Sequence, residues 1–277
     1  MENFEYTYEM YKESADALRK KLGDFTPRIL LILGSGLGAL GDTVENPVFV
    51  PYTEVPNMKH STAPGHNGRF VFGRLAGQDV AVMQGRLHTY EGWSFADVSY
   101  PVRVMRLLGA EKLIVTNAAG AANRSFNVGD LMLITDHIKL FGVSPLCGKN
   151  IDEFGPRFPD MTHVYTPALF DIARDSAKEL GITLREGVYM YFPGPQYETP
   201  AEVRAATLLG ADVTGMSTVP EATVAAHCGM EVLGFTLCTN MAAGVLDQPL
   251  SGDEVIEMGK IAAPRFSALV CACLYKM

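Results

Sequence analysis

Three side chains that could bind an anion alternate within QGRLHTYEG, residues 84–92. They are Arg86, His88 and Tyr90, and in an extended chain all three would point the same way, because a strand has a period of two residues. Arginine offers a planar fork that suits two phosphate oxygens, and histidine adds a donor whose charge can change near neutral pH. This stretch therefore predicts one wall of a phosphate site.

A glycine-rich loop lies further upstream, where residues 31–40 read LILGSGLGAL. The loop matches a relaxed dinucleotide fingerprint, and Glu54 follows where a ribose-binding acid would belong. That fingerprint requires a long crossover helix, but Asn46 and Pro47 end any helix after about nine residues, which argues against NAD binding. Two interpretations stay open. The glycines could serve a tight, closely packed turn, or the loop could hold a phosphate through its N–H groups and the hydroxyl of Ser35.

A second histidine, His66, lies between glycines in the turn STAPGHNGR. A single loop histidine is usually a surface residue. Together with Ser35, Arg86 and His88, all in glycine-rich contexts, it indicates an anion site without identifying the anion.

Short apolar runs rich in β-branched residues alternate with stretches of helical periodicity, and no linker or repeat divides the chain. Several of the expected strands are apolar almost throughout, as in a sheet covered on both faces. We therefore predict one α/β domain over residues 1–277, with a central mixed β-sheet flanked by helices on both faces. Strands are expected at Arg28–Leu33, Arg69–Leu75, Asp79–Met83, Lys112–Thr116, Leu131–Thr135, Gly187–Tyr191, Asp212–Gly215 and Glu231–Cys238. Helices are expected at Tyr6–Leu22, Ser94–Leu108, Thr166–Leu180, Ala201–Leu209, Glu221–Cys228 and Asp253–Leu274.

Glycine-rich polar turns follow most of these strands, in GSG, QGRLHTYEG, TNAAG, GPQYET, GMSTVPE and TNMAAG. Ligands of open α/β sheets bind beyond the carboxyl ends of the strands. These turns therefore predict one composite pocket. The long coil Phe141–His163 is expected to carry function or a subunit contact, because loops of this length are seldom passive.

The composition narrows the possible partners and location. The 277 residues carry a net charge of −8, which argues against binding to nucleic acid or an anionic membrane. The amphipathic N-terminus does not read as a signal peptide, and no run of about eighteen apolar residues predicts a membrane span. The five cysteines form no CxxC pair, so we interpret them as buried, reduced side chains, with no metal site. A cytoplasmic protein is expected.

A family resemblance emerges when the motifs are taken in order. GSGLG, STxPGHxGR, MQGRxHxYEG, VTNAAG, GPxxE, GMSTVPE and a late TN resemble purine nucleoside phosphorylase of the trimeric, low-molecular-mass kind that acts on inosine and guanosine. The likeness extends from the N-terminus to about Lys260. It implies a nucleoside phosphorylase fold, a homotrimer, small-molecule substrates, and inorganic phosphate as co-substrate with no cofactor or metal.

The resemblance also implies roles for individual residues. Asn240, Glu198 and His88 would be catalytic. The phosphate would be held by Ser35, His66, Arg86, His88, the backbone of Ala118, and Ser217. The nucleoside would contact Tyr90, Tyr197, Glu198, Met216, Ser217, Asn240 and, from a neighbouring subunit, Phe158.

These residue types suit phosphorolysis. The purine gains negative charge as its bond to the ribose breaks, and an amide donor at N7, from Asn240, would stabilise that charge. The carboxylate of Glu198 can accept hydrogen bonds from N1–H and from the 2-amino group of guanine. Purely structural roles stay open for both residues, since asparagine also suits a turn and Glu198 precedes an expected helix.

Three positions depart from the family pattern. Gly252 stands where many relatives carry a histidine near the ribose 5′-hydroxyl. Tyr197 replaces a phenylalanine of the mammalian relatives, and Thr214 places a hydroxyl where a small aliphatic residue is common.

Alternative functions are a methylthioadenosine phosphorylase, an NAD-linked oxidoreductase and a catalytically silent nucleoside-binding protein. Methylthioadenosine phosphorylases carry Asp in place of Asn240 and lack a glutamate at 198. Both residues here therefore favour a 6-oxopurine.

Overall fold

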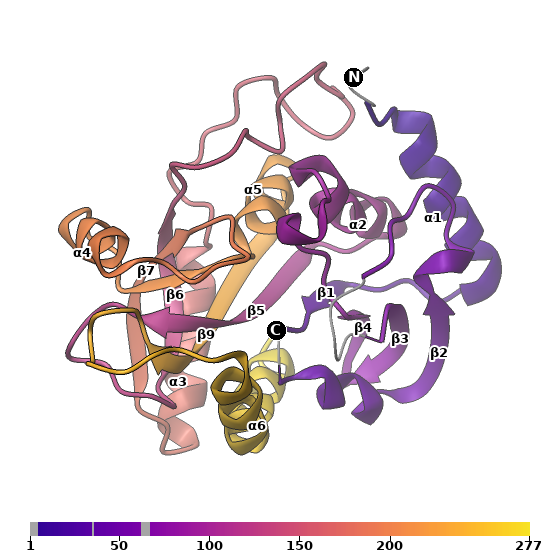
Figure 1. Cartoon of the computed structure of the whole chain (residues 1–277). Coiled ribbons are helices and arrows are strands. Elements are labelled where there is room, and N and C mark those ends of the chain that lie inside the picture. Colours follow the sequence, from indigo (N-terminus) through magenta and orange to yellow (C-terminus); the bar gives the residue numbers. More distant parts are fainter. Residues whose placement is uncertain (1–4, 35, 62–66) are drawn as a thin grey trace.

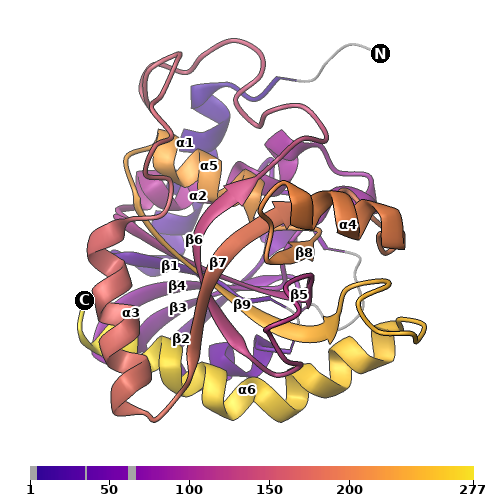
Figure 2. The ribbon, with the colours of Figure 1, turned by 90° about the vertical axis from the view of Figure 1, so that its left-hand side faces the viewer.

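The chain folds around one nine-stranded mixed β-sheet, in the strand order β2-β3-β4-β1-β5-β8-β7-β6-β9. The computed structural model describes residues 5–34, 36–61 and 67–277. Strand β9 pairs with β5 as well as with β6, so the last five strands of that order close into a ring (Figures 1 and 2). The strands are β1 (Ile29–Ile32), β2 (Glu45–Pro51), β3 (Arg69–Leu75), β4 (Gln78–Gln84), β5 (Lys112–Ala121), β6 (Leu131–Ile138), β7 (Leu184–Tyr191), β8 (Val213–Gly215) and β9 (Glu231–Met241).

Helices cover both faces of the sheet, which confirms the predicted single-domain α/β architecture. Helices α1, α2 and α5 pack through one apolar core on the first face, and α3 and α6 through a second core on the other (Figure 2). Helix α4 lies at the side of the sheet, beside β7 and β8 (Figure 2). The helices are α1 (Tyr8–Leu22), α2 (Phe95–Leu108), α3 (Pro167–Glu179), α4 (Pro200–Leu208), α5 (Val219–His227) and α6 (Gly252–Tyr275).

The segment after β1 shows why the dinucleotide interpretation fails. A short 3₁₀ helix at Gly38–Thr43 follows the glycine loop, and no α-helix lies between β1 and β4 in the described chain. The same region holds strand β2, which the sequence did not predict because prolines interrupt its apolar pattern. Pro47 and Pro51 are tolerated because β2 is an edge strand that pairs with β3 alone.

Two glycines of the loop serve close packing. A Cβ atom on Gly34 would lie 2.7 Å from the carbonyl oxygen of Thr116 in β5. A Cβ atom on Gly36, whose φ is +86°, would lie 2.6 Å from the Cα atom of Gly259 in α6. Side chains at these positions would push the loop away from the sheet and from α6. Ser35 lies outside the described residues, so its expected contact with phosphate stays a prediction.

Strands β5 and β9 are among those that run beyond their predicted ends. Strand β5 continues past Thr116 to Ala121, and β9 continues past Cys238 to Met241. The extensions pair with each other, with Gly120 opposite Asn240. Pairing between β5 and β9 thus overrides the weak strand preference of glycine and asparagine. Asn240 therefore lies on a strand rather than in a turn.

The expected long coil is present, since no helix or strand lies between residues 139 and 166. Cys147 in this coil is exposed, which corrects the prediction that the cysteines are buried. All the cysteines are free thiols. None of the helices in the described ranges is long and apolar enough to span a membrane.

Candidate active site

A cavity of about 160 Å³ lies where the glycine-rich turns converge. Segments that follow or end several strands line it, together with the start of α6. The sequence therefore locates the pocket correctly, at the carboxyl ends of strands such as β1, β4 and β5. Its lining residues are Gly34, Arg86, His88, Tyr90, Ala118, Ala119, Gly120, Tyr197, Glu198, Thr214, Gly215, Met216, Ser217, Thr239, Asn240 and Val255.

Arg86 is the buried cation of this cavity, with a side chain only 2% exposed. Its Nε donates to Oε1 of Glu221 at 2.7 Å. Its Nη1 donates to the carbonyl oxygen of Thr116 at 2.9 Å and to Oγ of Ser217 at 3.0 Å. These bonds fix the plane of the guanidinium in a dry environment, where an anion is held strongly.

His88 and Tyr90 join Arg86 in the cavity, although the chain between them is not extended. A 3₁₀ turn, Thr89–Glu91, follows His88 and corrects the expectation of a continuous strand geometry. The two rings stack at 4.6 Å between centroids. Glu91 accepts from the backbone N–H of His88 at 2.7 Å and lies 3.3 Å from its Nδ1. The turn therefore sets the orientation of the imidazole.

A second group of buried polar side chains comprises Glu198, Thr214 and Asn240. Their residues are 8%, 2% and 4% exposed. The hydroxyl of Thr214 donates to Oε2 of Glu198 at 3.2 Å. Burial raises the pKa of Glu198, and the Thr214 hydrogen bond only partly offsets that rise. The group combines a carboxylate, a hydroxyl and an amide, so it can both donate and accept hydrogen bonds.

Gly120 makes room for the side chain of Asn240. A Cβ atom at position 120 would lie 2.9 Å from Oδ1 of Asn240. That oxygen is buried and has no hydrogen-bond partner among the described residues. Because buried polar atoms are normally paired, this oxygen is open to accept a hydrogen bond from a group that enters the cavity.

The remaining predicted residues fall into three cases. Ala118, Met216 and Ser217 line the cavity, and Tyr197 lines it with 36% of its surface exposed. Phe158 is 87% exposed and does not line the cavity of its own chain. Ser35 and His66 lie outside the described residues.

Sequence reasoning missed Glu221 as a site residue, although it closes the motif GMSTVPE. Glu221 is a charged residue on the buried helix α5, and its side chain is 3% exposed. A carboxylate in an apolar helix is the signal that could have revealed it, because such a group needs a buried partner.

Comparisons with known proteins agree with this geometry. The family described as the Phosphorylase superfamily matches residues 28–275. Purine nucleoside phosphorylase 1 of Geobacillus stearothermophilus is 52% identical over 266 residues, covering 96% of this chain and 97% of that protein. The Bos taurus purine nucleoside phosphorylase is 47% identical over 274 residues, covering 96% and 94%. The chain belongs to the purine nucleoside phosphorylase family.

Solved structures of this family share the fold over almost the whole chain. The Schistosoma mansoni purine nucleoside phosphorylase in complex with inosine superposes with a TM-score of 0.93 at 39% identity, covering 98% of this chain and 97% of that one. A Schistosoma mansoni purine nucleoside phosphorylase in complex with adenosine gives 0.93 at 40% identity, covering 98% of both chains. As a purine nucleoside phosphorylase, the chain is a pentosyltransferase that cleaves purine nucleosides with phosphate.

The described part of the chain holds no group of three or more His, Cys, Asp or Glu side chains placed to bind a metal ion. The polar side chains that line its cavity include a guanidinium, a carboxylate and an amide, from Arg86, Glu198 and Asn240.

Proposed function

We propose that the chain cleaves 6-oxopurine nucleosides, such as inosine and guanosine, to the free base and ribose 1-phosphate. The observation that carries this proposal is one cavity shared by a guanidinium, Arg86, and by a buried carboxylate and amide, Glu198 and Asn240. The first can bind phosphate, and the other two match the hydrogen-bonding edge of a 6-oxopurine.

Phosphate would bind at Arg86, His88, Ser217 and the backbone of Ala118, with Ser35 and His66 completing the site. The guanidinium is oriented before phosphate arrives, because Glu221, Thr116 and Ser217 already hold it. Fixing phosphate beside the ribose replaces an encounter of separate molecules with a nearly unimolecular step.

The ribose would lie between phosphate and base, against Tyr90 and Met216. A phosphate oxygen attacks C1′ while the bond from C1′ to N9 breaks. The electron pair of that bond passes to the purine, which takes up a proton, and the sugar leaves as its 1-phosphate. The negative phosphate also stabilises the positive charge that develops on the ribose.

The purine would be recognised by Glu198 and Asn240, with Tyr197 against the base. The carboxylate of Glu198 accepts from N1–H, which a 6-oxopurine carries and adenine lacks. The amide of Asn240 donates to N7 as charge builds there and need not change its protonation state. This chemistry requires no cofactor and no metal, and we propose that the enzyme uses neither.

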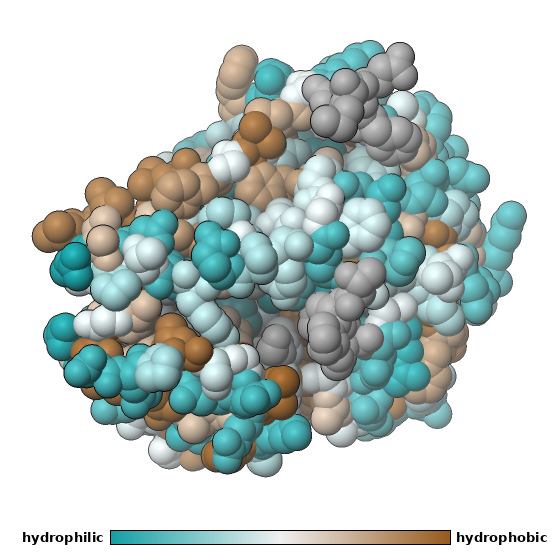
Figure 3. All heavy atoms as spheres, in the orientation of Figure 1, coloured by the Kyte–Doolittle hydropathy of each residue, from teal (hydrophilic) through white to brown (hydrophobic). Residues whose placement is uncertain are grey.

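We propose that the enzyme assembles as a homotrimer in which Phe158 contacts the active site of a neighbouring subunit. Its 87% exposure supports this, because an exposed aromatic side chain on a long loop typifies an interface residue. Leu208 on α4 is 89% exposed, and Figure 3 shows hydrophobic side chains gathered over that helix at the upper left. A cytoplasmic location fits the free thiols.

The test is base release from inosine, guanosine and adenosine, with and without phosphate. We expect phosphate-dependent release from the first two, and Glu198→Gln should lower their kcat/KM sharply while leaving the KM for phosphate nearly unchanged. Cleavage of adenosine but not inosine would overturn the base assignment, and release without phosphate would overturn the mechanism. Sedimentation should give the mass of three chains, and a monomer would refute the assembly.

A further inference from the structure

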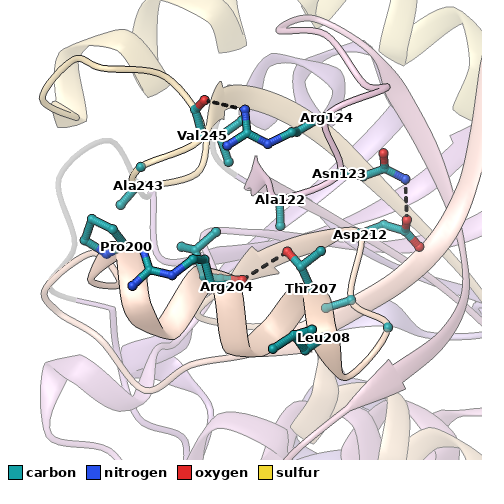
Figure 4. A pocket seen from close by; sticks show the side chains of 14 residues that line it. Ala122, Asn123, Arg124, Pro200, Arg204, Thr207, Leu208, Asp212, Ala243 and Val245 are labelled. Carbon is teal, nitrogen blue, oxygen red and sulfur yellow. Dashed lines mark hydrogen bonds between the residues drawn. The ribbon is translucent and has the colours of Figure 1, made fainter.

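A second and larger cavity, of about 610 Å³, lies beside α4 and outside the active site. Figure 4 shows its walls: α4, the segment that follows β5, and the loop that follows β9. Most of the wall is apolar, with Val203 and Leu208 on one side and Val245 on another. The volume falls within the range of small-molecule sites.

The charged groups of this cavity favour an anion. Arg124 and Arg204 line it from opposite walls (Figure 4). Asp212 is its acidic lining residue, and its two oxygens accept from the amide of Asn123 at 2.7 Å and from the backbone N–H of Val188 at 2.8 Å. The cavity thus keeps an excess positive charge in a chain whose net charge is −8.

The two arginines differ in the hydrogen bonds that they make within the described protein. Arg124 donates through Nη1 to the carbonyl oxygen of Val245 at 3.2 Å, which holds its guanidinium at the cavity wall. Arg204 is exposed on α4 and makes no side-chain hydrogen bond or ion pair within the described ranges. Guanidinium forks match phosphate oxygens, so a phosphate group is the anion that suits them best.

The walls of this cavity are close in sequence to the buried polar residues Glu198, Thr214 and Asn240. Pro200 in α4 follows Glu198 by two residues, and Asp212 precedes Thr214 by two. Ala243 in the loop after β9 follows Asn240 by three. A ligand in the cavity would therefore press on the backbone segments that position all the polar groups proposed to read the purine.

One contact ties two of these walls together. Gly244, with φ +74°, approaches Pro200 so closely that a Cβ atom on it would lie 2.6 Å from the proline Cβ. The loop after Asn240 and the start of α4 after Glu198 therefore pack directly against each other. A ligand that separates or clamps them would change the spacing of the amide and the carboxylate.

We propose that this cavity is a second ligand site for a phosphate monoester with a ring body, of the size of a nucleoside 5′-monophosphate, and that its occupation alters purine affinity. The phosphate pairs with the arginines while the ring packs between Val203 and Val245. The effect on purine affinity rests on the proposed roles of Glu198 and Asn240, whereas binding itself does not.

The test is calorimetric titration of the whole enzyme with GMP, with hypoxanthine and phosphate present at saturation. These two ligands fill the active site without reacting, because neither carries the ribose. We expect one GMP per chain, with ribose 5-phosphate at least fivefold weaker because it lacks the ring. Arg204→Ala should weaken GMP about tenfold, and adding Arg124→Ala should weaken it further. The matched control, Arg28→Ala with Arg74→Ala, removes the same charge from exposed strand ends and should change GMP affinity less than twofold.

Each result decides one part of the proposal. The second site would be refuted if GMP did not bind to the enzyme saturated with hypoxanthine and phosphate. It would also be refuted if the cavity variants and the control variant lost GMP affinity equally. Binding of ribose 5-phosphate as tight as GMP would refute a ring-bearing ligand. Coupling is measured as the change in hypoxanthine affinity at saturating GMP. An unchanged affinity would refute the coupling while leaving phosphorolysis itself intact.

Discussion

Replacing Glu221 by alanine should destabilise the protein far more than loss of an ordinary salt bridge. Glu221 and Arg86 meet at 2.7 Å with side chains 3% and 2% exposed, so neither charge reaches water. Alanine at 221 would remove the carboxylate that accepts from Nε of the buried guanidinium, while Thr116 and Ser217 would still accept from its Nη1.

The expected cost follows from that burial. Removing one partner of a buried ion pair costs about 3–5 kcal/mol, because the remaining charge has lost its compensation. For a chain of this size, such a loss lowers Tm by roughly 6–20 °C. Leucine at both 86 and 221 should recover much of that stability, since it removes the buried charge as well.

Urea unfolding at one fixed protein concentration, in phosphate-free buffer, measures this cost. The pair Arg174–Glu186 provides the matched control, because it has a similar separation of 2.8 Å but side chains 46% and 38% exposed. Glu186→Ala should cost less than about 1 kcal/mol. Adding phosphate should stabilise Glu221→Ala more than the wild type, since the anion then becomes the principal counter-charge of Arg86.

Equal costs for Glu221→Ala and Glu186→Ala would refute this reasoning. So would a double leucine variant that is less stable than Glu221→Ala. Either result would mean that burial does not control the energy of the Arg86–Glu221 pair.

Three further predictions concern the base and the ribose. Asn240→Ala should lower kcat about 10²–10³-fold while changing the KM for phosphate little, and equal loss of both in steady-state assays would make Asn240 structural. Gly252→His should lower the KM for inosine, because a Cβ atom at 252 meets nothing within 4 Å and Val255 of the same helix lines the cavity; an unchanged KM would show that the 5′-hydroxyl needs no such partner. Burial raises the pKa of Glu198, so lowering the pH through that raised value protonates the carboxylate and should raise the KM for inosine; Glu198→Gln should lack this pH dependence, and a parallel profile in both proteins would assign it to another group.

The raised pKa of Glu198 also makes folding stability depend on pH. A carboxyl whose pKa is higher in the folded state than in the unfolded state binds its proton more tightly when folded. Folding stability from this group is therefore lost as pH rises from the unfolded pKa through the folded one. Glu198 at neutral pH thus stabilises the fold less than its protonated form would, a cost that substrate binding can offset.

The sequence by itself determined the chemistry and most of the framework. Apolar runs and helical periods located eight of the nine strands and all six α-helices, because burial on a sheet or helix face imposes those periods. The glycine-rich turns after the strands indicated a composite pocket, since parallel strands bring their carboxyl ends to one edge. Arg86 and His88 were named from residue type and spacing, and Glu198 and Asn240 from the family resemblance.

Only the tertiary structure decided which weak local preferences would be overridden. Strand β2 keeps its prolines because it lies at the sheet edge, and β9 reaches Asn240 because β5 pairs with it. Glu221 pairs with Arg86, which lies 135 positions earlier in the sequence, and a local sequence pattern cannot predict a contact over that separation. Pairing, burial and charge compensation depend on segments far apart in the chain, and they become visible only when those segments meet.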